Sequence, residues 1–125
     1  MTNTPKFFFD TADTEAIKKI WTKLQPYCRS EYCLGITTNP NALSKVYCNS
    51  LTQFEKLVKE MSIVLEDIKG PGGLIYVQVP YSTMSEKQIL KWVDFILKLD
   101  TGKSKIALKI PHFSYILNLT PAKVS

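Results

Sequence analysis

Long apolar runs are missing from this sequence. Nowhere in its 125 residues does an uninterrupted apolar stretch approach the roughly 18 to 20 residues that a membrane-spanning helix requires. The amino-terminal residues also lack a basic segment followed by an apolar stretch of signal-peptide length. These absences argue against a membrane protein, and we expect a cytoplasmic domain with no membrane partner.

Arginine is nearly absent. Arg29 is the only one, although lysine brings the formal net charge to +5. Recognition of phosphates and base edges relies heavily on arginine, and the lysines are scattered along segments with helical patterns. We therefore expect a mildly basic, solvated surface and no nucleic-acid partner.

Cysteine and histidine are also scarce. The sequence has three cysteines, Cys28, Cys33 and Cys48, and a single histidine, His112. Their spacing matches no zinc motif, so we expect reduced structural thiols and no metal ion. Reduced thiols agree with a cytosolic location.

The informative features are four short apolar runs that each end in a side chain capable of chemistry. They lie at residues 7–10, 35–39, 75–78 and 106–109, and segments with helical apolar spacing separate them. Alternation of strands and helices is typical of a parallel sheet in an α/β fold. We expect one domain over residues 1–125, since 45% of the residues are apolar and can form an ordinary core.

Three long helices are predicted between the strands, and a short helical stretch near residues 42–46 is expected after the turn at Pro40 and Asn41. The first runs from Asp13 to Leu24, and the second follows Ser50, which with Gln53 forms a capping-box pattern and is followed by a long apolar stripe. The third follows a similar pattern at Thr83 and Glu86. We expect its buried stripe to comprise Ile89, Leu90, Val93, Ile96 and Leu97.

Strand alternation predicts that the polar residues share one face of the sheet, because residues two apart on a strand point the same way. The aromatic rings of Phe7 and Phe9 should then face the helices while Asp10 faces away from them. The side chains expected on the polar face are Asp10, Thr37, Asn39, Gln78 and Lys109.

Lys109 is the predicted nucleophile. Burial in an Ile-Ala-Leu-Lys-Ile strand would favour the neutral amine, whose lone pair can attack a carbonyl group and form a Schiff base. The protonated imine would draw electrons from the neighbouring carbon–carbon bond. The alternative is a lysine of an edge strand whose amine extends into solvent.

The other four residues have predicted supporting roles. Asp10 could take a proton from a substrate hydroxyl, or it could cap the helix that follows. Asn39 could hold a hydroxyl or carbonyl group and Thr37 could order a water, although Thr-Thr-Asn-Pro also suits a turn that ends a strand. Gln78 could fix the same water or bond within the sheet. We interpret His112 as a loop residue.

Three motifs together resemble the transaldolase family, including its small fructose-6-phosphate aldolase branch. They are Lys-Phe-Phe-Phe-Asp-Thr-Ala-Asp at 6–13, Gly-Ile-Thr-Thr-Asn-Pro at 35–40 and Ile-Ala-Leu-Lys-Ile-Pro at 106–111. The resemblance implies an eight-stranded β/α barrel of the TIM type and Schiff-base chemistry without a cofactor.

Residue by residue, the resemblance assigns the Schiff-base lysine to Lys109, the acid/base aspartate to Asp10 and the donor-binding asparagine to Asn39. Thr37 matches the threonine of the same motif. Many transaldolases have a glutamate where this chain has Gln78, whereas the small aldolases have glutamine there. The resemblance therefore implies that the dihydroxyacetone enamine is hydrolysed in preference to being transferred to a second aldose. The implied substrate is a ketose phosphate such as fructose 6-phosphate, in carbohydrate metabolism and the pentose phosphate pathway.

The resemblance covers the first four strands of such a barrel, up to about Pro111. A complete barrel takes about 250 residues, so we expect a half barrel, truncated after the fourth strand, that alone would be a weak or inactive transferase or lyase. Its open edges call for a partner, either a homo-oligomer or a complementing second half. The alternative function is a catalytically inactive half barrel with an interaction or regulatory role.

Overall fold

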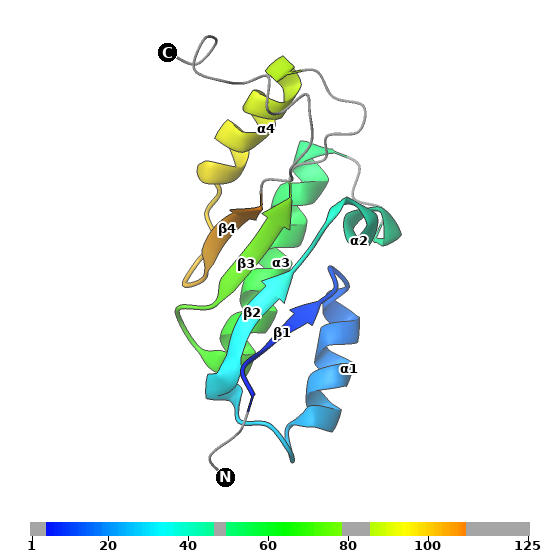
Figure 1. The fold of residues 1–125 in the computed structure, drawn as a ribbon, viewed down its shortest axis with the longest axis vertical. Helices are drawn as coiled ribbons and strands as arrows, with labels where there is room; N and C mark the ends of the chain where they lie inside the picture. Colours follow the sequence, from blue (N-terminus) through cyan, green and yellow to red (C-terminus); the bar gives the residue numbers. More distant parts are fainter. Residues whose placement is uncertain (1–4, 47–49, 79–85, 110–125) are drawn as a thin grey trace.

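The fold is an alternation of strands and helices (Figure 1). The computed structural model describes residues 5–46, 50–78 and 86–109. Its strands are β1 (Phe7–Asp10), β2 (Cys33–Thr37), β3 (Leu74–Gln78) and β4 (Lys105–Lys109). Its α-helices are α1 (Thr14–Leu24), α2 (Pro40–Lys45), α3 (Leu51–Lys69) and α4 (Glu86–Leu97), with a 3-10 turn, η1, at Ser30–Tyr32.

The strands form one sheet in chain order, β1-β2-β3-β4, and every pairing is parallel. This confirms the predicted mixed α/β architecture with a parallel sheet. One row of the register joins Asp10, Thr37, Tyr76 and Ala107 across all four strands. Such a sheet is compatible with part of a β/α barrel.

The hydrophobic core lies between the sheet and the helices behind it. Ile36, Ile75 and Val77 are fully buried, and α3 packs against the two central strands that carry them. At the β1 edge, Trp21 of α1 packs on the rings of Phe7 and Phe9, as the alternation predicts. The polar side chains predicted to carry the chemistry lie on the strands' opposite face.

Capping residues define where the helices begin. Ser50 accepts a hydrogen bond from the Gln53 amide at the start of α3, as its position in the sequence predicts. The α3 helix ends at Lys69, because Gly70 adopts a positive φ of 82° that favours glycine. Thr83, the predicted cap of the next helix, lies outside the described residues.

The predicted stripe of α4 is only partly correct. Ile89 and Ile96 are buried, but Leu90 and Leu97 are 53% and 65% exposed. The helix lies at the β4 edge of the sheet (Figure 1), where fewer neighbours can cover its apolar face. An apolar spacing shows which residues could be buried, whereas the neighbours decide how many of them are.

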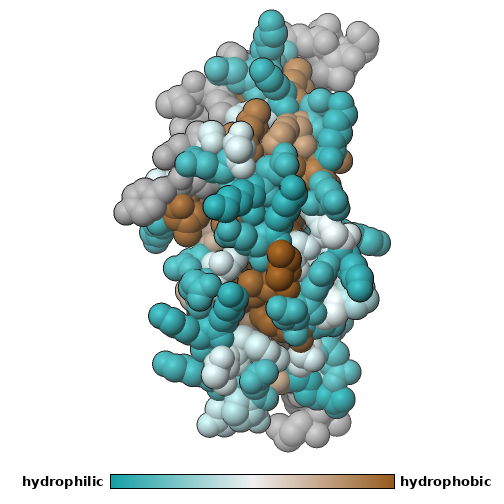
Figure 2. Space-filling model, turned by 180° about the vertical axis from the view of Figure 1, so that it is seen from behind, coloured by the Kyte–Doolittle hydropathy of each residue, from teal (hydrophilic) through white to brown (hydrophobic). Residues whose placement is uncertain are grey.

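The surface seen from behind the sheet is mainly hydrophilic, with apolar areas near its middle and in the upper part of the view (Figure 2). This pattern agrees with amphipathic helices that turn one stripe toward the core. In the described part of the chain, no helix combines the length and the apolar character needed to cross a membrane.

Two of the three cysteines are placed, and both are free thiols. Cys28 is half-buried and Cys33 is buried in β2. Burial raises the pKa of the Cys33 thiol, so this side chain stays protonated near neutral pH and behaves as a small apolar residue. Cys48 lies outside the described residues.

We predict that Gly35 is required for the contact between β2 and β3. A Cβ at this position would lie 1.8 Å from the carbonyl oxygen of Leu74, so Gly35→Ala should lower the free energy of unfolding by about 3 kcal/mol or more. Denaturant unfolding measures the loss. The control is Gly72→Ala, which has open space around the added carbon but a φ of +87° and should cost about 1 kcal/mol. Equal losses in the two variants would contradict the steric argument.

Ser62 and Ser104, which are both buried, should respond differently to truncation. Ser62 donates a hydrogen bond to the Thr101 carbonyl oxygen, whereas the Ser104 hydroxyl has no hydrogen-bond partner in the described structure. Ser62→Ala should therefore lower the free energy of unfolding by about 1 kcal/mol, while Ser104→Ala should leave it unchanged or raise it by up to about 1 kcal/mol. Thermal or urea unfolding tests both, and a loss of stability in Ser104→Ala would contradict the prediction.

Candidate active site

The carboxyl ends of the four strands meet at one edge of the sheet, where active sites of parallel α/β folds form. Asp10, Gln78 and Lys109 are the last residues of β1, β3 and β4, and Thr37 is the last of β2. Asn39 follows two residues after β2. The structure therefore places all five predicted residues on, or directly after, this edge.

The Asp10 carboxylate is held by β2. The Thr37 hydroxyl donates a hydrogen bond of 2.7 Å to Oδ1 of Asp10, and the two residues are register partners. Asp10 is otherwise exposed. A charge-assisted bond of this kind orients a carboxylate without burying it.

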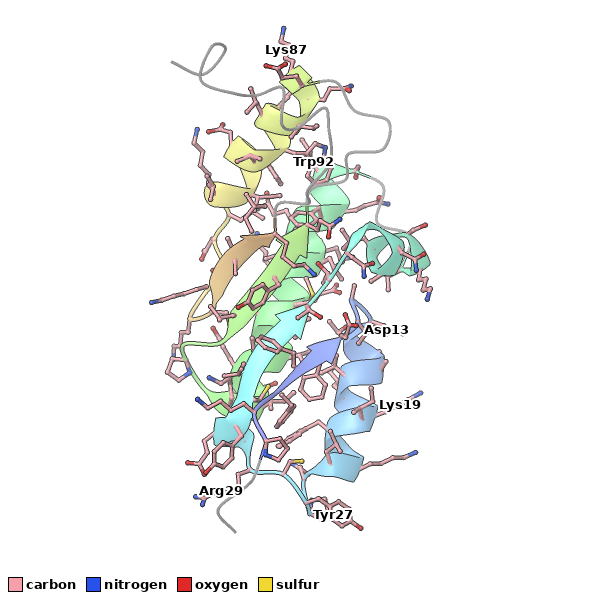
Figure 3. All side chains as sticks on the ribbon, viewed as in Figure 1. Asp13, Lys19, Tyr27, Arg29, Lys87 and Trp92 are labelled. Carbon is pink, nitrogen blue, oxygen red and sulfur yellow. The ribbon has the colours of Figure 1, made fainter. Side chains whose placement is uncertain are left out.

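Asp10 does not cap α1, so the alternative role considered for it is wrong. Asp13 is the cap, and its Oδ1 accepts from the amides of Glu15 and Ala16 at 3.1 and 3.2 Å. Figure 3 shows Asp13 at the start of α1, next to the tip of β1. Both aspartates of the Asp-Thr-Ala-Asp sequence suit a helix start, and the chain path decides which of them serves.

Thr38 fastens the end of β2 to β3, a role that the sequence did not suggest. Its backbone amide and its hydroxyl both donate to the carbonyl oxygen of Tyr76, each at 2.9 Å. The side chain is fully buried. Because Thr38 lies between Thr37 and Asn39, these two hydrogen bonds fix the position of both neighbours at the rim. The sequence signal that could have indicated this role is the position of a polar residue between two candidate site residues.

Asn39 caps the short helix α2. Its Oδ1 accepts from the Ala42 amide at 2.7 Å, as the turn interpretation of Thr-Thr-Asn-Pro predicts. The side-chain amide nitrogen carries two further hydrogen-bond donors. The cap therefore uses the oxygen of Asn39 and leaves its donating group chemically suited to a ligand oxygen.

A pocket of about 340 Å³ opens between the loop after β1 and helix α2. Asp10 and Asn39 both line it, so the structure brings these two predicted residues together. The other lining residues are Thr11, Asp13, Asn41, Ala42, Lys45 and Val46. The sequence predicts the short helix that carries Lys45 and Asn41, but neither residue was among the predicted site residues.

Lys109 and Gln78 form a second part of the rim. They are register partners on β4 and β3, and both are half-buried. The strand of Lys109 lies three positions from that of Asp10, roughly 14 Å across the sheet at the ordinary strand spacing. Of the three predicted catalytic residues, Asp10 and Lys109 therefore end the two edge strands of the described sheet, and Gln78 ends the strand beside that of Lys109.

The chemistry available at this edge is that of an amine, a carboxylate, two amides and a hydroxyl. Among the described residues, no group of three or more histidine, cysteine or acidic side chains could hold a metal ion. An amine can form an imine with a carbonyl compound, and a carboxylate can accept a proton from a hydroxyl. His112 lies outside the described residues.

Comparison with known proteins gives a distant match. No family model matches the chain. Over 106 residues it is 24% identical to a probable transaldolase 2 of Bacillus anthracis, an alignment that covers 85% of this chain and 41% of the relative. The chain thus spans about two fifths of the length of the curated relative it matches. The match suggests a transaldolase-like family at this general level.

Proposed function

We propose that this chain is part of a transaldolase-like enzyme that cleaves or transfers a dihydroxyacetone unit of a ketose phosphate. The observation that carries the proposal is the gathering of Asp10, Thr37, Gln78 and Lys109 at the carboxyl ends of four parallel strands. The similarity to a protein named as a probable transaldolase supports it. The full fold in this proposal is a β/α barrel, of which the sheet is one half.

In the proposed reaction, the Lys109 amine attacks the ketone carbon of the substrate. Loss of water from the adduct leaves a protonated imine, and the nitrogen keeps the bond to the former carbonyl carbon. Asp10 then removes the proton of the hydroxyl on the second carbon beyond the imine carbon. The bond between the first and second carbons beyond the imine carbon breaks, its electron pair moves toward the iminium nitrogen to form an enamine, and the second carbon leaves as the aldehyde group of an aldose.

Thr37 is a positioning residue in this scheme. Its 2.7 Å bond to Oδ1 of Asp10 holds one carboxylate oxygen, so that the other can face the substrate hydroxyl. The Asn39 amide would donate to a hydroxyl of the dihydroxyacetone unit in the pocket that it shares with Asp10. Gln78, beside Lys109, would hold the water that hydrolyses the enamine.

A specific observation favours a second candidate, a catalytically inactive half barrel with an interaction role. Asp10 and Lys109 end the two edge strands of a four-stranded sheet, and a complete barrel of the family needs eight strands around the site. In this second candidate, the three sequence motifs are retained from an ancestral enzyme but catalyse no reaction. Imine formation at Lys109 distinguishes the two functions.

Borohydride trapping tests the Schiff base. Incubation with dihydroxyacetone or fructose 6-phosphate followed by reduction should add one reduced adduct to the peptide that contains Lys109, as seen by mass spectrometry. Lys109→Ala should abolish the adduct. Lys105→Ala is the matched control, because it removes an exposed lysine from the other end of β4 and should leave trapping intact. An adduct that survives in Lys109→Ala, or is absent from the wild-type chain, would contradict the proposal.

Substitution of Asn39 separates its structural role from its proposed binding role. Asn39→Ala should lower the free energy of unfolding by about 1 kcal/mol, because the cap of α2 is lost. Asn39→Asp keeps an oxygen for the Ala42 amide but loses the side-chain donors, so it should keep the stability and still weaken dihydroxyacetone trapping several-fold. Unfolding and trapping are measured on the same samples. Undiminished trapping in Asn39→Asp would assign Asn39 to the cap alone.

A further inference from the structure

Two aromatic rings meet on the face of the sheet that carries the candidate site. Phe8 shares this face with Asp10, and Tyr76 shares it with Gln78, because residues two apart on a strand point the same way. The ring centroids of Phe8 and Tyr76 lie 5.2 Å apart in an edge-to-face arrangement, and both residues are half-buried. The proposed reaction assigns no role to either ring.

The contact between these rings shows that side chains on this face are staggered. Phe8 pairs with Gly35 across β1 and β2, whereas Tyr76 pairs with Thr37 across β2 and β3. The rings therefore meet although they are two residues out of register over two strands. Gly35, on the strand between them, has no side chain to separate them. The tilted strands of β/α barrels have such a stagger, so that alternate strands supply one layer of side chains.

The same stagger places Thr37 and Lys109 in one layer. Thr37 is in register with Ala107 through β3, and Lys109 follows two residues after Ala107 on β4. This layer lies next to the rings of Phe8 and Tyr76, toward the carboxyl ends of the strands. The two rings therefore form a floor beneath the Lys109 amine, which we call the aromatic floor.

The backbone holds the aromatic floor at a fixed height. The Tyr76 carbonyl oxygen accepts hydrogen bonds from the amide and the hydroxyl of Thr38, each at 2.9 Å. Ile75 and Val77, on either side of Tyr76, are fully buried behind the sheet. Phe9, next to Phe8, is also buried there. Neither strand can shift along its axis without disturbing the core.

We propose that the aromatic floor sets the size of the ketone that Lys109 accepts, which makes Phe8 and Tyr76 specificity-determining residues. This inference rests on the proposed function, because it concerns the ketone that forms the imine. The imine carbon carries two carbon arms. The arm whose bond breaks must face Asp10, which lies above the floor, two residues beyond Phe8 on β1. The arm that stays intact then turns toward the rings.

Close packing explains why the aromatic floor discriminates by size. The one-carbon arm of dihydroxyacetone can lie against the rings, whereas a longer arm must displace one of them. Displacement of a packed ring is unfavourable, and an apolar pocket typically rejects one additional methylene by about tenfold or more. Removal of either ring should deepen the site and relax this limit.

Trapping with two symmetrical ketones tests the proposal. Dihydroxyacetone and 1,5-dihydroxypentan-3-one differ by one methylene in each arm, so either orientation of the second ketone puts a longer arm on the floor. We expect borohydride trapping at Lys109 of the wild-type chain to favour dihydroxyacetone by about tenfold or more, and Tyr76→Ala or Phe8→Ala to reduce this ratio to about threefold or less. Mass spectrometry of the Lys109 peptide measures both adducts.

Control variants separate the floor from general loosening of the fold. Tyr76→Phe keeps the ring and should keep the ratio. Phe7→Ala removes a ring from the same strand as Phe8, but this ring packs on Trp21 behind the sheet, so the ratio should again be kept. Tyr76→Leu, which shortens the side chain and keeps it apolar, should lower the ratio in a folded chain, as checked by denaturant unfolding. Unchanged ratios in Tyr76→Leu and Phe8→Ala, or an equal drop in Phe7→Ala, would overturn the proposal.

Reductive alkylation tests the floor without the proposed activity. Acetone and pentan-3-one, with cyanoborohydride, alkylate any accessible lysine amine, and the exposed Lys105 on the same strand serves as the reference. Relative to Lys105, Lys109 should disfavour pentan-3-one in the wild-type chain, and Tyr76→Ala should remove this difference. Equal selectivity at Lys109 and Lys105 of the wild-type chain would overturn the floor. A selective Lys109 that dihydroxyacetone does not trap would instead overturn the proposed function and support the floor.

Discussion

The in-register parallel pairing of four strands is the constraint on which the other features depend. Once Ile36, Ile75 and Val77 are buried against α3, the alternation of side chains leaves no choice for their neighbours. Thr37 and Tyr76 must then point to the opposite face. The same burial that stabilises the sheet thus sorts its apolar and polar residues between two surfaces.

Hydrogen bonds at the rim refine this sorting. Thr38 joins the end of β2 to Tyr76, and Thr37 holds the carboxylate of Asp10 from 27 residues away in the chain. Each of these bonds replaces bonds to water, so its net contribution to stability is only about 1 kcal/mol. Their effect is geometric, because they fix a carboxylate at the border of the pocket that Asn39 also lines.

The open edges and the separation of Asp10 from Lys109 are two results of one arrangement. A sheet in the order β1-β2-β3-β4 places its first and last strands as far apart as the sheet allows. Those strands carry the proposed acid/base and the proposed nucleophile. In the proposed function, the further strands of a complete barrel would therefore also decide the surroundings of both groups.

Sequence alone determined the order of strands and helices, the parallel sheet and the face on which Asp10, Thr37 and Lys109 lie, because alternation and helical spacing are local properties of the chain. It could not choose between Asp10 and Asp13 as the cap of α1, since both are chemically suitable. The tertiary structure shows that Asp13 is the cap and that Leu90 and Leu97 are exposed. It also places Lys45 at the pocket and Thr38 within hydrogen-bond distance of the Tyr76 carbonyl oxygen. Each of these depends on which distant segments become neighbours, and local patterns do not record distances between segments.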